Sequence, residues 1–120
     1  MDSIEQFGGN VRWTGAEKKV ARRAFDQALE RNLSAIIAEA KRMMANVASP
    51  SDLWGVEAYL TESRKNLDRI YQFRYSDLLR VFSVLMRDEW LHEADLVGLQ
   101  SEKIADIKRS AESLGRMLSE

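Results

Sequence analysis

Apolar residues recur at steps of three and four, which settle into alternation, along the first half of the chain, as on one face of a long helix. This stripe comprises Phe25, Leu29, Leu33, Ile36, Ala40, Met43 and Val47, and it is widened by Ile37 and Met44. Such heptad spacing keeps one face of a helix against a partner helix over many turns. Upstream, Thr14-Gly-Ala-Glu17 has the form of a capping box. The pattern therefore predicts a helix from this box to about Val47, beside a second long helix.

The second helix is expected to begin at Ser49-Pro50-Ser51-Asp52. Serine as N-cap, proline at the first helical position and an acid three residues after the cap are typical of a helix start. One side of this helix carries Leu53, Val56, Leu60, Leu67, Ile70 and Tyr71. Because the connection is so short, the two helices are expected to run antiparallel as an αα-hairpin. Trp54, Tyr59 and Met44 lie partly off the shared seam, which predicts that the hairpin meets a second copy of itself.

Two further amphipathic segments follow a break at Tyr75-Ser76. The first is a short helix, with Ser76 as its candidate cap and an apolar face formed by Leu78, Leu79, Phe82, Leu85 and Met86. The apolar periodicity is interrupted around residues 88–93, where the chain is expected to turn a corner and to pack Trp90 and Leu91 into the core. A final helix is predicted from about Ala94, with an apolar stripe of Leu96, Leu99, Ile104, Ile107, Ala111, Leu114 and Leu118.

These elements predict an all-α fold with a long helical hairpin and a small helical head. Residues 1–13 are expected to be a flexible lead, since Gly8, Gly9 and Asn10 discourage regular structure. Residues 14–75 are predicted to form the hairpin stalk with the dimer seam, and residues 76–120 the helical head. Two such stalks would dimerise into a helical bundle.

Composition and charge exclude several classes of function. The net charge of -1 gives no global electrostatic case for binding nucleic acid. The sequence contains no cysteine, so disulfides, thiolate metal ligands and cysteine nucleophiles are all excluded. No apolar run approaches the roughly 20 residues of a membrane span, and the acidic N-terminus is no secretory signal. We therefore expect a cytoplasmic protein without a membrane span.

One pattern suggests metal chemistry: Glu89-Trp-Leu-His92, an E-x-x-H of the kind found in di-iron bundles. Those sites need two such pairs and two further glutamates, and this chain has a single histidine. A dimer could supply the second pair, so a metal-binding bundle stays open as an alternative, although His92 as a surface or capping residue is favoured. The sequence has no glycine-rich phosphate loop and no nucleophile elbow. We therefore expect neither enzyme activity nor a cofactor or metal.

Lys18, Lys19, Arg22 and Arg23 form a basic cluster early in the first predicted helix. Acidic residues are interspersed along the chain, which favours an ordinary solvated helix surface. Basic residues near the positive end of a helix are, however, slightly disfavoured by its dipole. That conflict leaves room for a role in contacting a partner.

Trp54, Glu57 and Arg64 lie near one side of the second predicted helix. Aromatic and arginine side chains anchor interfaces because they combine large buried area with directional bonding. Together with Leu53 and Leu60, they are the candidate residues for dimer or partner binding. The alternative is that Trp54 belongs to the hairpin core and Arg64 is an exposed charge.

An ordered set of residues at fixed spacing resembles the fluorescence recovery protein family. It spans roughly residues 49–109 and comprises Asp52, Leu53, Trp54, Leu60, Arg64, Tyr71, Arg74, Ser76, Leu78, Val81, Phe82, Ser83 and Leu85, and more loosely Leu96, Leu99, Lys103 and Ile104. Members of that family are all-helical, non-catalytic homodimers. They bind the photoactivated orange carotenoid protein, detach it from the phycobilisome and speed its return to the resting form. The resemblance implies a regulator that prefers one conformation of its client, either this carotenoid protein or a related one.

By the same resemblance, Trp54 and Arg64 match family positions at the dimer and client-binding surface. Family members typically carry His-Asp where this chain has Glu57-Ala58, and the family's acid is expected to pair with the arginine across the dimer, so Glu57 is the candidate here. Arg80 replaces an aromatic residue near the client contact of the head, and Arg80 and Phe82 are the candidate contacts there. The alternative is a helical adaptor or scaffold dimer that serves an unrelated protein in a non-cyanobacterial host.

Overall fold

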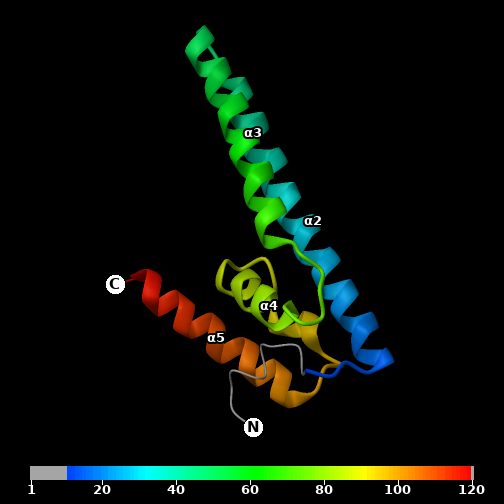
Figure 1. The fold of residues 1–120 in the computed structure, drawn as a ribbon. Coiled ribbons are helices and arrows are strands. Elements are labelled where there is room, and N and C mark those ends of the chain that lie inside the picture. The colour runs from blue at the N-terminus through cyan, green and yellow to red at the C-terminus, as the bar shows by residue number, and fades with distance from the viewer. Residues whose placement is uncertain (1–10, 120) are drawn as a thin grey trace.

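The computed structural model describes residues 11–119, which form four α-helices and one short 3₁₀ helix (Figure 1). The elements are α2 (Gly15–Ala45), α3 (Pro50–Ile70), α4 (Leu78–Arg87), η1 (Glu93–Leu96) and α5 (Ser101–Ser119). The predicted all-α fold is confirmed. The molecule is elongated, with extents of 58 × 33 × 22 Å, because the α2–α3 hairpin projects from the other helices.

Both predicted helix starts in the hairpin are confirmed by their capping bonds. The Thr14 hydroxyl accepts a hydrogen bond from the Glu17 amide at 3.1 Å, and the Glu17 carboxylate accepts one from the Thr14 amide at 3.1 Å. At the start of α3, the Ser49 hydroxyl accepts from the Asp52 amide at 3.3 Å, while the Asp52 carboxylate accepts from the Ala48 amide at 3.0 Å. Each cap satisfies amides that the first helical turn leaves without a partner.

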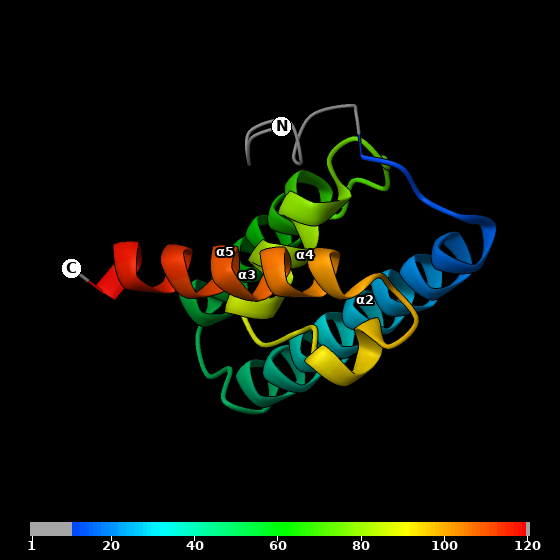
Figure 2. The same cartoon turned by 90° about the horizontal axis from the view of Figure 1, so that it is seen from below.

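The hydrophobic core lies in the head, and the first half of α2 belongs to it. Ala21, Ala24, Phe25 and Ala28 are all at most 5% exposed and pack with residues of α4, the corner and α5, among them Leu78, Phe82, Leu85, Leu91, Leu96 and Ile107. Figure 2 shows α5 crossing the head beside α4. The boundary expected between a stalk of residues 14–75 and a head of residues 76–120 therefore differs from the structure. Only the second half of α2 forms the stalk with α3.

The N-terminal lead was expected to be flexible over residues 1–13, of which residues 1–10 lie outside the described residues. Val11 and Trp13 pack against the head core. The indole nitrogen of Trp13 donates to the Tyr75 carbonyl oxygen at 3.2 Å, so the end of this lead is held in place.

Three predicted boundaries in the second half of the chain were wrong. Helix α3 ends at Ile70 instead of near Tyr75, because the Tyr71 hydroxyl turns toward α2 and donates to the Ala28 carbonyl oxygen at 3.2 Å. The N-cap of α4 is Asp77 rather than Ser76, and it makes no side-chain capping bond. The last helix begins at Ser101 instead of Ala94, after η1 and a turn.

Gly98 explains the late start of α5. Its φ is +114°, a conformation that side chains with a Cβ rarely adopt and that a helix cannot continue through. A Cβ at this position would also lie 2.7 Å from the Cγ2 atom of Val20. The backbone therefore passes directly against α2 here, and the chain turns into α5 only beyond this contact.

Candidate functional site

Six large apolar side chains of the stalk are exposed to solvent. They are Leu33, Ile37 and Met44 on α2 and Leu53, Trp54 and Leu60 on α3, each at least 40% exposed. We call these six residues, with Glu57 and Arg64, the stalk face. Contiguous exposed apolar side chains are typical of interaction sites, so the stalk face is the candidate site.

The stalk face is one continuous strip because of the helical register. Residues 33, 37 and 44 share one side of α2, and residues 53, 57, 60 and 64 share one side of α3. The seam between the helices buries Val56, which is 5% exposed, and leaves Leu53 and Leu60 at its rim. Since the helices are antiparallel, both exposed stripes turn toward the same side of the hairpin. The hairpin therefore presents an apolar strip that neither of its own helices covers.

Trp54 lies at the outer edge of this strip. Its indole is 63% exposed, so the expectation that the hairpin alone does not bury it is confirmed, and the alternative of a hairpin-core tryptophan is wrong. It follows Leu53 by about 100° around the helix, which points it away from α2. Burying a side chain of this size against a partner stabilises a complex by about 2 to 3 kcal/mol.

The strip also carries two charges that do not meet within the chain. The Glu57 carboxylate accepts a hydrogen bond from the Thr61 hydroxyl at 2.7 Å. Arg64 is exposed and forms no ion pair or hydrogen bond with any residue in the range 11–119. The two residues are seven positions apart, about 10.5 Å along the helix axis, so they cannot pair directly in one chain. Arg64 is thus an exposed cation beside apolar surface that forms no ion pair with the described residues.

In the head, the structure separates the two predicted contact residues. Arg80 is exposed and binds Asp77 through two hydrogen bonds, of 2.8 Å and 2.7 Å. The bond from Arg80 lowers the pKa of the Asp77 carboxyl below its ordinary value. Phe82 is 0% exposed and lies in the core, so its side chain is inaccessible to a partner in this fold. Its place in the apolar stripe of α4 was the sequence signal for burial.

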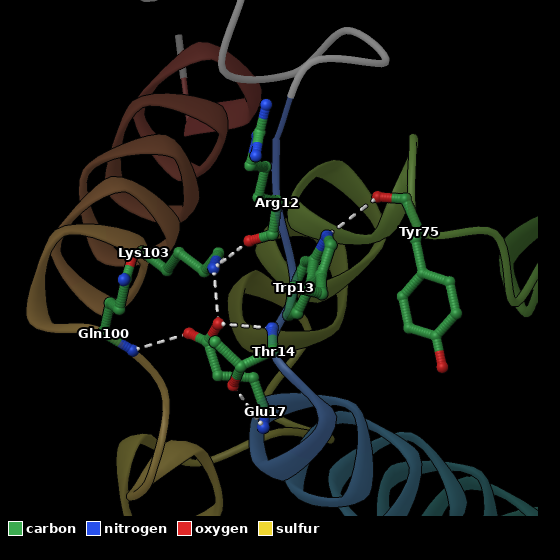
Figure 3. Close-up of polar contacts among 7 residues, drawn as sticks. All are labelled: Arg12, Trp13, Thr14, Glu17, Tyr75, Gln100 and Lys103. Carbon is green, nitrogen blue, oxygen red and sulfur yellow. Dashed lines mark hydrogen bonds and ion pairs between the residues drawn. The ribbon is translucent and has the colours of Figure 1, made fainter.

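The sequence analysis did not predict a buried polar cluster that joins the start of α2 to the start of α5 (Figure 3). Glu17 and Lys103 are 2% and 5% exposed, and the Lys103 ammonium lies 2.8 Å from Glu17 Oε1. The other carboxylate oxygen accepts from the Gln100 amide at 2.9 Å, and Lys103 also donates to the Arg12 carbonyl oxygen at 2.5 Å. Burial raises the pKa of Glu17, but the bonds from Lys103, Gln100 and Thr14 outweigh it and leave the pKa lowered. The cluster fixes the start of α5 against the start of α2.

A second ion pair fixes the corner after α4 to the middle of α2. Arg31 donates to both carboxylate oxygens of Asp95, at 2.7 Å and 3.1 Å, and to the Trp90 carbonyl oxygen at 2.9 Å. The hydrogen bond from Arg31 lowers the pKa of Asp95, which also accepts from the His92 amide at 2.9 Å. These contacts set the direction of the stalk relative to the head.

The described part of the chain includes the E-x-x-H pattern that suggested metal binding. Within it, no group of three or more histidine, cysteine, aspartate or glutamate side chains could hold a metal ion. Glu89 and His92, the residues of the E-x-x-H pattern, are both exposed. Of the helices in this range, none combines the length and apolar character needed to cross a bilayer.

The fold is an all-helical module with an exposed apolar strip along its hairpin. The chain belongs to the family described as photoprotection regulator fluorescence recovery protein, whose model matches residues 13–111. The resemblance seen in the sequence is thereby confirmed, and the chain is a member of a family of photoprotection regulators.

Individual relatives agree with this assignment. The chain is 27% identical over 99 residues to the fluorescence recovery protein of Synechocystis sp. PCC 6803, a match that covers 82% of this chain and 91% of that protein. The solved structure of the Fremyella diplosiphon fluorescence recovery protein matches with a TM-score of 0.80 and 31% identity, over 84% of this chain and 99% of the other. The Synechocystis structure matches with a TM-score of 0.80 and 27% identity, over the same shares.

Proposed function

We propose that this protein is a non-catalytic, homodimeric regulator that binds photoactivated orange carotenoid protein and speeds its return to the resting form. The cytoplasm is its expected compartment. The observation that carries the proposal is the stalk face, with its exposed Trp54 and unpaired Arg64, on a chain of the fluorescence recovery protein family. An uncovered apolar strip with an aromatic and an arginine anchor suits a protein interface.

The homodimer is proposed from the symmetry of the strip. In a two-fold dimer with antiparallel α3 helices, a residue on one side of the axis faces a residue of the partner's α3 that lies the same number of positions from the axis on its other side in the sequence. If Leu60 lies beside that axis, Glu57 of one copy faces Arg64 of the other, and the reverse pair forms on the opposite side. Leu53 and Trp54 then extend the apolar contact toward the hairpin tip. This arrangement gives Arg64 an anionic partner, which it does not have among the residues that the structure describes.

The regulatory step is proposed as a preference for one client conformation. A protein that binds one of two conformations more tightly shifts its client toward that conformation, and no covalent step is required. On the head, Arg80 is the remaining candidate contact, since Phe82 is buried. To contact the client, Arg80 would either leave its ion pair with Asp77 for a carboxylate of the client or contact the client while still paired with Asp77.

The test is the dark recovery of photoactivated orange carotenoid protein, followed by its visible absorbance with and without this protein. We expect faster recovery and a complex on gel filtration. Leu60→Glu places a charge in the stalk face and should remove the acceleration, whereas the matched control Val97→Glu, on an exposed head residue outside the stalk face, should keep it. An unchanged recovery rate together with no complex would overturn the proposed client.

A second candidate is a dimeric adaptor for an unrelated protein, favoured by the engagement of Arg80 with Asp77 and by Ala58 in place of the family's acid. This candidate keeps the same dimer but changes the client. A pull-down from the native host distinguishes the two, because only the adaptor predicts a bound protein without a carotenoid-binding domain.

A further inference from the structure

The start of α2 carries four exposed cations and runs next to the segment that joins α3 to α4, which carries a fifth (Figure 1). We call them the basic surface: Lys18, Lys19, Arg22 and Arg23 of α2 and Arg74 of the joining segment. The group lies apart from the stalk face, since Arg23 precedes Leu33 by ten residues, about 15 Å along the helix.

Aromatic rings hold two of these cations in place. The Lys18 ammonium lies 5.0 Å from the centre of the Tyr75 ring, and the Arg22 guanidinium lies 4.6 Å from the centre of the Phe73 ring. Those two rings are in contact, with 5.3 Å between their centres, and Phe73 also packs edge-on against the buried Phe25. Cation–π contacts of this kind order long basic side chains. A partner therefore meets cations that are already positioned, which lowers the entropy cost of binding.

The five cations of this surface outnumber the nearby acids Asp26, Glu30 and Asp77. Arg22 lies 3.4 Å from Asp26, but Lys19 and Arg23 form no ion pair or hydrogen bond with the residues that the structure describes. The nearby Glu17 carboxylate is buried against Lys103. The positive end of the α2 dipole adds to the same potential. Because the whole chain has a net charge of -1, this positive charge is concentrated rather than general.

We propose that the basic surface docks a short acidic segment of a protein partner. Carboxylates would bind Lys18 and Arg22, which lie over the rings of Tyr75 and Phe73, and the neighbouring Lys19 and Arg23. Asp26 and Glu30 line one hollow with Lys19, Arg22 and Arg23 and limit the surface on the side of the stalk, so it fits a short segment. A nucleic-acid strand is disfavoured, because its continuous phosphates would meet these acids and because such binders carry a basic domain as a whole. This docking goes beyond the proposed function and is independent of the stalk face.

Fluorescence anisotropy with a labelled peptide of about ten glutamates tests the proposal on the full chain at low salt. The Lys19→Glu/Arg23→Glu variant is expected to weaken binding by about tenfold, and added salt should weaken wild-type binding further. The acids are tolerated by the fold, because both positions are exposed on α2. Lys41→Glu/Lys65→Glu, which reverses two exposed stalk cations, is the matched control and should change binding by less than about twofold.

Amide chemical shifts of the labelled protein locate the peptide, and we expect changes confined to residues 18–23 and 73–75. Equal losses in both double variants, shifts centred elsewhere, or no peptide binding by the wild type would each overturn the proposal. The proposal would also be overturned if an oligonucleotide of equal charge bound the wild type more tightly than the peptide does and if Lys19→Glu/Arg23→Glu lost this binding. Dark recovery of the carotenoid protein is measured separately, so failure here leaves the proposed function standing.

Discussion

The carboxylate of Glu17 bonds to three separate segments. It caps α2 through the Thr14 amide, accepts from the Gln100 amide before α5, and pairs with Lys103. The capping role could be predicted from sequence because it depends on two residues three positions apart. The other two could not, because they depend on residues more than eighty positions away that only the folded head brings close.

Replacing Glu17 with glutamine should destabilise the head at neutral pH by about 3 to 5 kcal/mol, because Lys103 is left buried without its anion. The folded-state pKa of Glu17 lies below its ordinary value of 4.5, so folding favours the ionised form. Its contribution is therefore fully present above about pH 4.5 and is lost as the pH falls through the folded-state pKa. Wild-type stability should fall more steeply in acid than that of Glu17→Gln. Urea unfolding from about pH 7 to 3 measures this, with the exposed Glu112→Gln as control.

Glu89 stands at a backbone position that suits glycine. Its φ is +68°, and it follows α4 in a Schellman motif, where the Trp90 amide donates to the Leu85 carbonyl oxygen and the Glu89 amide to that of Met86. Glu89→Gly should stabilise the protein by about 0.5 to 1 kcal/mol by removing the left-handed strain. The control is Asp88→Gly, whose position has an ordinary φ of -85°, and it should give no gain. Equal thermal shifts in the two variants would contradict this assignment of strain.

Among the elements, helix starts with side-chain caps were predictable and helix boundaries set by distant contacts were not. Thr14 and Ser49 fix the starts of α2 and α3 through neighbours a few residues away. The end of α3 depends on Tyr71 reaching α2, and the start of α5 depends on Gly98 passing Val20. Those contacts join residues far apart in sequence, so apolar periodicity alone extended both helices too far.

Two glycine substitutions test this view of the elements. Gly98→Ala should destabilise the head by about 1 to 3 kcal/mol, because the new Cβ meets Val20 at a strained backbone position. Gly55→Ala in α3 should stabilise by about 0.5 to 1 kcal/mol, since no atom lies within 4 Å of the added Cβ and alanine favours the helix. Chemical denaturation at one protein concentration measures both. If Gly98→Ala were neutral, the close passage against α2 would not control the start of α5.

For the molecule as a whole, the sequence predicted which surface lacks a partner better than it predicted how the head is assembled. Residue spacing alone predicted that Trp54 and Met44 lie outside the seam of the hairpin, and in the structure both are at least half exposed. The division between stalk and head was less accurate, because Ala21, Ala24 and Ala28 are too small to reveal a core face by hydrophobicity. They nevertheless bring α2 against the rest of the head and make one rigid base for the stalk.

Charge reversal across the proposed two-fold axis tests the whole assembly. Arg64→Glu should weaken the dimer by about tenfold, because it places a second carboxylate opposite the partner's Glu57 beside apolar surface. The swap Glu57→Arg/Arg64→Glu restores opposite charges at both sides of the axis and should recover most of the affinity. Sedimentation across a concentration series measures this, with Lys65→Glu as an exposed control on the same helix. Leu60→Glu places two like charges beside the axis and should give monomers. Adding the Glu57→Arg/Arg64→Glu swap should not restore this dimer. If the Glu57→Arg/Arg64→Glu variant dimerised no more tightly than Arg64→Glu alone, Glu57 would not be the residue that pairs with Arg64 of the other copy.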